Sequence, residues 1–122
     1  MTATTLNRIL WTVRILVAAA FIAAGGAKLA GVPDMVAMFD KIGLGQGFRY
    51  ITGAVEVAGG FALLVRAVAG LAGAALAETM LVAVGVHLLV IGGSPLPAIV
   101  LGTLSGFVAW QLRPGSTLLR KA

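Results

Sequence analysis

Apolar residues fill the chain in long blocks that few charged side chains interrupt. The stretch from 79 to 112 carries no Asp, Glu, Lys or Arg and is too long for one helix. A Gly-, Ser- and Pro-rich turn at 92–97 divides it. Because a membrane-spanning helix needs about 20 largely apolar residues, the pattern predicts four spans in one domain that covers the whole chain. The predicted spans are 9–29, 49–66, 68–91 and 96–112.

The most polar interval, residues 31–49, separates the first two spans. Within it, Pro33 can occupy a first helical position, and apolar residues follow at near-helical spacing up to Ile42. This pattern predicts a short interfacial helix. The predicted fold class is all-α: a transmembrane antiparallel four-helix bundle with a short interfacial helix between spans 1 and 2.

The composition supports a lipid environment. Apolar residues make up 60% of the chain and charged residues only 11%, against about 45–50% and about 25% in soluble domains. The net charge of +5 comes from nine Lys and Arg that are spread along the chain, so we expect a role in topology and no nucleic-acid partner. A cleaved signal peptide is the alternative interpretation of the first block, but the rest of the chain is equally apolar.

The positions of the cations predict the orientation. With a cytoplasmic N-terminus, six cations lie inside and three lie outside, which favours two cytoplasmic termini. The inner group is Arg8, Arg14, Arg66, Arg113, Arg120 and Lys121, and the outer group is Lys28, Lys41 and Arg49.

Five ionisable residues lie within the predicted spans. A charge near the bilayer centre costs about 2.5 to 3.5 kcal/mol, so such residues normally face the bundle interior and find partners. We take them as the candidate ligand-binding residues, and they are Lys28, Glu56, His87, Glu78 and Arg14.

Depth predicts a pair between Lys28 and Glu56. Lys28 lies at the outer end of the first span, on the same face as Arg14. Glu56 lies about 9 Å below the outer surface, on a stripe with Gly53 and Gly60 that lets a neighbouring helix approach closely. This pair either fixes the assembly of the helices or forms a site for a polar ligand or quinone in the outer half of the bundle.

The other three residues are open to more than one interpretation. Arg14 can extend to lipid headgroups or reach toward Glu78, which we place near the midplane. His87 lies near the outer end of the third span, as an interfacial hydrogen-bonding residue or as a ligand or proton-exchanging group. Glu78 and His87 are half a helical turn apart, so they face different neighbours. Four glycines are expected at close-packing positions: Gly25, Gly26, Gly59 and Gly60.

Several chemistries have no support in the residues. The chain has no Cys and one His, which excludes disulfides and thiolate sites and leaves no expected metal site. It has no HExxH motif and no Ser, His and Asp set. We therefore expect a protein that is not catalytic by itself, and any redox role would use a borrowed cofactor.

Three segments resemble motifs of the DoxX-like family of small membrane proteins. Residues 25–29 resemble the G-x-x-K-L that ends the family's first helix, and residues 53–60 resemble its G-x-x-E-x-x-G-G. The group from Glu78 to His87 is similar to its third helix. The family's C-terminal Gly-Pro-Gly pattern, followed by Ser, Leu and Asp, is only partly met at 113–118, which lack the Asp.

The resemblance implies a multi-pass protein of the bacterial inner membrane in which Lys28 and Glu56 are the best site candidates. Some members are associated with quinone-linked oxidation or with complexes that resist oxidative stress. Our first hypothesis is a subunit that anchors or assists a redox complex, with an oxidoreductase partner and noncovalently bound quinone or lipid. The alternatives are a stand-alone binder or carrier of a small apolar molecule, and a scaffold without ligand whose lipid-facing surface is a homo- or hetero-oligomer interface.

Overall fold

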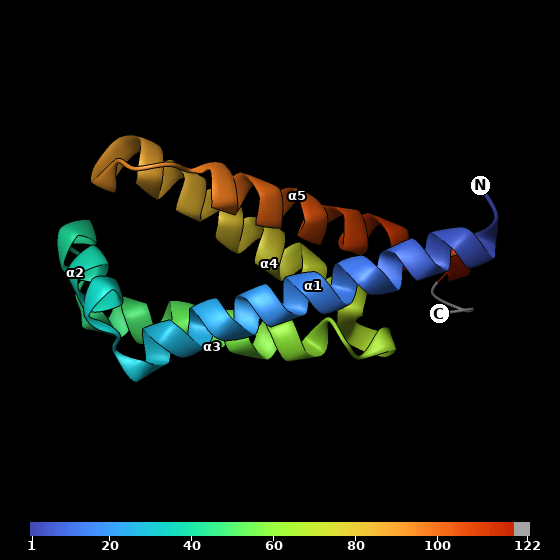
Figure 1. Ribbon diagram of the computed structural model, residues 1–122, viewed down its shortest axis with the longest axis horizontal. Helices are drawn as coiled ribbons and strands as arrows, with labels where there is room; N and C mark the ends of the chain where they lie inside the picture. The colour runs from blue at the N-terminus through green and yellow to red at the C-terminus, as the bar shows by residue number, and fades with distance from the viewer. Residues whose placement is uncertain (119–122) are drawn as a thin grey trace.

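The computed structural model describes residues 1–118, and this part is helical and contains no strand. Each predicted span contains a helix, and the predicted short helix after the first span is confirmed. The elements in chain order are α1 (Ala3–Ala30), α2 (Pro33–Ile42), α3 (Gln46–Ala62), α4 (Arg66–Val86), the π-helical segment η1 (His87–Ile91) and α5 (Leu96–Gln111) (Figure 1).

Two of the helical segments are long and apolar enough to cross a membrane, judged by length and composition. They are α1 and the continuous segment Arg66–Ile91, which joins α4 to η1. The helix α5 is apolar but shorter. The length and composition of these two segments agree with the predicted membrane character.

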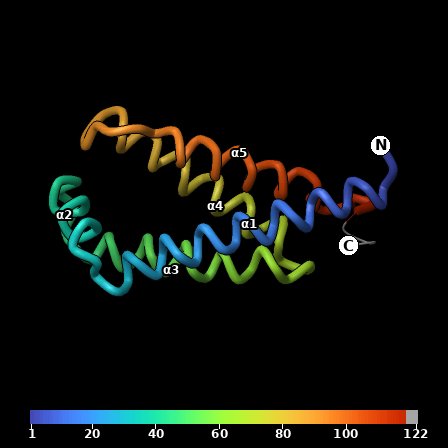
Figure 2. Tube along the Cα trace, in the orientation of Figure 1, coloured from blue at the N-terminus to red at the C-terminus, as the bar shows by residue number. Residues whose placement is uncertain are grey.

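The helices form two close pairs, α1 with α3 and α4 with α5. Figure 1 shows that the two pairs diverge toward the end where α2 lies, which we call the α2 end. The N-terminus and the turn between α3 and α4 lie toward the other end, as the chain trace in Figure 2 also shows. The space between the pairs at the α2 end is where the candidate site forms.

Glycines set the close approach of α1 to α3. A Cβ atom added to Gly25 would lie 2.7 Å from the Gly53 carbonyl oxygen, and one added to Gly60 would lie 3.1 Å from the Ala18 carbonyl oxygen. Gly59 contacts Leu76 of α4 in the same way. The predicted close packing is thus confirmed at three of four glycines. It is wrong for Gly26, where an added Cβ would meet open space, because one residue further along a helix points about 100° away from the contact.

Cations bind the carbonyl oxygens at the C-terminal ends of the helices. Arg14 of α1 donates from Nε to the Leu63 carbonyl at the end of α3, over 2.7 Å. Arg49 of α3 donates back to the Lys28 carbonyl in the last turn of α1. The Lys28 carbonyl also accepts from the Gly31 N–H over 3.3 Å. Both arginines lie at a helix end whose dipole favours positive charge.

Two further cations repeat this arrangement. Lys41 of α2 donates from Nζ to the Ile91 carbonyl over 2.8 Å, and Arg113 donates to the Trp110 carbonyl over 2.6 Å. From their positions in the sequence, these two residues are expected only to set the topology. Two of the cations counted there, Arg120 and Lys121, lie outside the described residues.

Candidate functional site

The predicted ion pair between Lys28 and Glu56 is formed. Lys28 Nζ lies 2.7 Å from Glu56 Oε1, and the two side chains are 13% and 3% exposed. The backbones are close enough because glycine stands one turn before each residue. An added Cβ at Gly53 would lie 3.0 Å from Lys28 Cβ, and one at Gly25 would lie 2.9 Å from Glu56 Cβ. The glycines and the charged pair therefore form one packing unit between α1 and α3.

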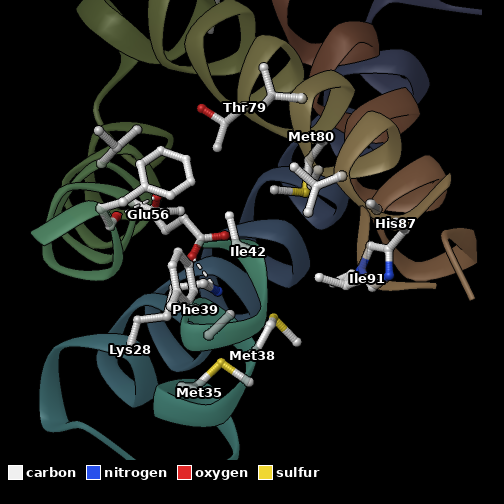
Figure 3. Close-up of a pocket in the computed structure, with 18 of the residues that line it drawn as sticks. Lys28, Met35, Met38, Phe39, Ile42, Glu56, Thr79, Met80, His87 and Ile91 are labelled. Atoms are coloured by element: carbon white, nitrogen blue, oxygen red, sulfur yellow. Dashed lines mark hydrogen bonds and ion pairs between the residues drawn. The ribbon is translucent and has the colours of Figure 1, made fainter. Parts of the chain in front are cut away.

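This pair lines a cavity of about 380 Å³ between the two helix pairs at the α2 end. Every helix contributes to the wall, and Figure 3 shows the side chains of α2 closing one side of it. The wall is mainly apolar, and flexible thioether side chains adapt to irregular shapes. Its larger apolar members are Met35, Met38, Phe39, Ile42, Phe48, Ile51, Met80, Ile91 and Leu101.

Few polar groups in the cavity can donate a hydrogen bond to an occupant. The hydroxyls of Thr52 and Thr79 each donate to the backbone of their own helix, to the Phe48 and Ala75 carbonyls over 2.8 Å. The charges of Lys28 and Glu56 compensate each other, so a charged occupant would leave one charge uncompensated in an apolar site. The cavity therefore suits an uncharged, largely apolar molecule with a hydrogen-bonding group.

His87 supplies a second polar group to the same cavity. Its Nδ1 lies 2.9 Å from the Gly92 carbonyl oxygen. Because a carbonyl can only accept, Nδ1 must carry the hydrogen, and in the neutral form of the ring Nε2 is then an acceptor. Figure 3 shows His87 across the cavity from Glu56. His87 also begins the π-helical segment η1, a geometry that is frequent at functional sites.

Glu78 and His87 face different spaces, as their half-turn separation predicts. Glu78 is exposed and lines a groove between α4 and α5, outside the cavity. The predicted contact between Arg14 and Glu78 is wrong, because Arg14 binds the end of α3 instead.

The expectation that Arg14 extends to lipid headgroups is also wrong. Its side chain is fully buried, and the guanidinium carbon lies 3.7 Å from the centre of the Trp11 ring. The hydrogen bond to the Leu63 carbonyl keeps the Arg14 side chain between α1 and α3.

Two parts of the site have no signal in the sequence pattern. Arg49, which borders a predicted span, is buried and ties α3 to the end of α1. No sequence spacing marks such a contact, because its acceptor is a backbone carbonyl. The second part is α2, whose Phe39 ring packs edge-on against Phe48 at 5.6 Å. Its apolar spacing predicts an interfacial helix, and the same residues form a cavity wall.

Within residues 1–118, no three His, Cys, Asp or Glu side chains are grouped so that they could hold a metal ion. The groups that could hold a cofactor are the Lys28 and Glu56 pair and His87, which line one cavity. The arrangement can bind and orient an uncharged molecule through hydrogen bonds at two places.

Comparison with known proteins places these residues in a family. The family model described as "DoxX-like family" matches residues 12–111 of the chain. The matched region includes both residues of the ion pair and His87. No curated protein and no solved structure matches the chain.

Proposed function

The chain belongs to the DoxX-like family, and from this premise we propose that it is a small bundle of four antiparallel membrane-spanning helices that binds an uncharged apolar molecule. The bundle lies in the bacterial inner membrane, with both termini cytoplasmic and the α2 end outside. The bound molecule is a quinone or a lipid, held at the Lys28 and Glu56 pair.

The apolar exterior supports the membrane arrangement. Ile51, Leu71 and Leu81 are between 63% and 74% exposed on α3 and α4, a surface that suits lipid better than water. The helices α3 and α5 have 17 and 16 residues, or about 26 and 24 Å at 1.5 Å per residue. Each therefore spans most of a hydrocarbon core of about 30 Å, and flanking residues complete the crossing.

The charges near the helix ends support the orientation. Arg8, Arg66 and Arg113 are exposed at the end opposite α2. At the α2 end, Arg49 is buried and Lys28 is paired, which leaves Lys41 as the exposed cation there among the described residues. An excess of exposed positive charge marks the cytoplasmic side.

The cavity that contains the Lys28 and Glu56 pair carries the proposal. A pair that only holds two helices together needs no open space beside it, because the partner charge and additional hydrogen bonds offset the cost of burying each charge. Here the pair borders about 380 Å³ of space among apolar side chains. Pockets for small molecules have this composition, with an apolar wall and a few placed polar groups.

We propose that the protein anchors or assists a redox complex and is not itself the catalyst. The family resemblance supports this setting, in which a quinone in the cavity would meet an oxidoreductase partner. The stand-alone binder is the second form of the proposal and needs only the cavity. Copurification separates the two, because only the first form requires a partner protein.

The test is native purification in mild detergent, followed by mass spectrometry of extracted quinones and lipids and of copurifying proteins. We expect a stoichiometric quinone or lipid in the wild type and its loss in Glu56→Gln and Lys28→Met. Arg66→Met removes an exposed cation far from the cavity and should retain the molecule. Wild-type protein that carries no such molecule would refute binding, and equal losses of binding and thermal stability in the cavity variants would favour a purely structural pair.

A further inference from the structure

Glu78 is a carboxyl group in the middle of an apolar helical segment. It lies 12 residues after Arg66, about 18 Å along a segment that ends at Ile91. Its side chain is exposed, so in a membrane it would face the lipid. Within residues 1–118, no side chain lies within ion-pair or hydrogen-bonding distance of it. Polar groups at such a depth are normally covered by another helix.

The surface around Glu78 is a groove of about 450 Å³ between α4 and α5. Ala77, Ala98 and Gly102 line it, and small residues of this kind let a further helix approach closely in a membrane. Met80 and Ala98 line both the groove and the cavity of the proposed function, but Glu78 and Thr103 line the groove alone.

Thr103 gives the groove a second polar group. It is exposed, and its hydroxyl donates to the Ile99 carbonyl over 2.7 Å. A hydroxyl has one hydrogen, so Thr103 Oγ can only accept a further hydrogen bond. Hydrocarbon disfavours the charged form of a carboxyl group, and the neutral form supplies the matching donor. Glu78 and Thr103 line the same groove and therefore lie at similar depths.

We propose that this groove is the interface of a homodimer in which the carboxyl group of each Glu78 donates to Thr103 of the other copy. Two copies inserted in the same direction are related by an axis along the membrane normal, which keeps every residue at its own depth. Each Glu78 then meets the Thr103 of its neighbour, and both hydrogen bonds form together. The chain is thus complementary to itself here, with no second kind of protein required.

The competing occupant of the groove is a helix of another protein that carries a basic residue. Substitutions of Glu78 distinguish this helix from a second copy of the chain. Glu78→Gln keeps a donor for Thr103 but removes the negative charge, so the homodimer should persist and a basic partner should be lost. Glu78→Leu removes both the hydrogen-bond donor and the negative charge. Because Glu78 is exposed, neither variant should disturb folding, which circular dichroism checks.

The absence of native Cys permits a direct experiment in membranes. A single Leu81→Cys, in the groove and 73% exposed, should form an intermolecular disulfide on mild oxidation. The matched control is Leu16→Cys, on α1 and 64% exposed, which should stay monomeric. Glu78→Leu should lower the dimerisation constant about tenfold, since it removes two hydrogen bonds between membrane helices, and Glu78→Gln should leave the constant near wild type.

Three results would overturn the homodimer. The first is a wild-type protein that stays monomeric at every protein-to-lipid ratio, as expected if an acyl chain fills the groove. The second is equal cross-linking in wild type and Glu78→Leu. The third is a loss in Glu78→Gln as large as that in Glu78→Leu, which would show that Glu78 does not act as a hydrogen-bond donor to Thr103.

Discussion

Arg14 and Arg49 make reciprocal contacts between α1 and α3. Each arginine lies on one helix and donates a hydrogen bond to a carbonyl at the C-terminal end of the other helix. Arg14 reaches from α1 to the Leu63 carbonyl, and Arg49 reaches from α3 to the Lys28 carbonyl. The two contacts lie at opposite ends of the helix pair and both arginines are buried. They prevent α1 and α3 from sliding along each other, which keeps Lys28 at the level of Glu56.

Loss of the Arg14 contact should destabilise the protein. Arg14→Met leaves the Leu63 carbonyl without its partner, and an unsatisfied buried polar group costs about 1–3 kcal/mol. We expect a reduction of that size in the free energy of unfolding, measured by titrating the protein from mild detergent into denaturing micelles. Arg8→Met, which removes an exposed cation of the same helix, is the control. Equal stability of the two variants would show that the contact has no structural role.

A methyl group at Gly25 should push α1 and α3 apart. The added Cβ would lie 2.7 Å from the Gly53 carbonyl oxygen, so the backbone itself must move. Overpacking of this kind costs about 1–3 kcal/mol, and we expect a loss of that size in Gly25→Ala, together with weaker ligand binding.

The adjacent Gly26→Ala is the matched control. An added Cβ there meets open space, and alanine favours a helix over glycine by about 1 kcal/mol. This variant should be as stable as the wild type or more so in the same unfolding titration. Similar destabilisation by both substitutions would contradict the close contact between Gly25 and Gly53.

The positions of the helices and the central ion pair were predictable from the sequence. Apolar blocks of membrane-spanning length mark each helix, and the depths of Lys28 and Glu56 follow from the helical rise. The partners of Arg14 and Arg49 were not predictable, because backbone carbonyls at a helix end have no sequence signature. The cavity was not predictable either, since it depends on how far the two helix pairs diverge.

The helix α2 should control access to the cavity. It forms part of the wall and is flanked by Gly31 and Gly43, both with positive φ. Its Lys41 makes an exposed hydrogen bond to the Ile91 carbonyl. Breaking this bond in Lys41→Met should favour opening about 2- to 10-fold, the effect expected for one hydrogen bond.

Reagent accessibility measures this opening. Ala83→Cys places a thiol in the cavity wall, and a water-soluble methanethiosulfonate should modify it faster when Lys41→Met is also present. Leu44→Cys, 70% exposed after α2, reports the intrinsic reaction rate and should not change. An unchanged rate at Ala83→Cys would mean that the Lys41 bond does not hold α2 closed.

The two ring nitrogens of His87 have separable roles. Nδ1 donates to the Gly92 carbonyl, and in the neutral form of the ring Nε2 is an acceptor for a cavity occupant. An asparagine amide can replace the Nδ1 donor but offers nothing at the position of Nε2, so His87→Asn should keep its thermal stability and bind a short-chain benzoquinol about 2- to 10-fold more weakly, the effect of one hydrogen bond. His87→Phe keeps the ring shape without either nitrogen and should lose both stability and affinity. A quinol titration measures the affinity, and thermal unfolding in the same detergent measures the stability. Wild-type affinity in His87→Asn would exclude Nε2 from binding.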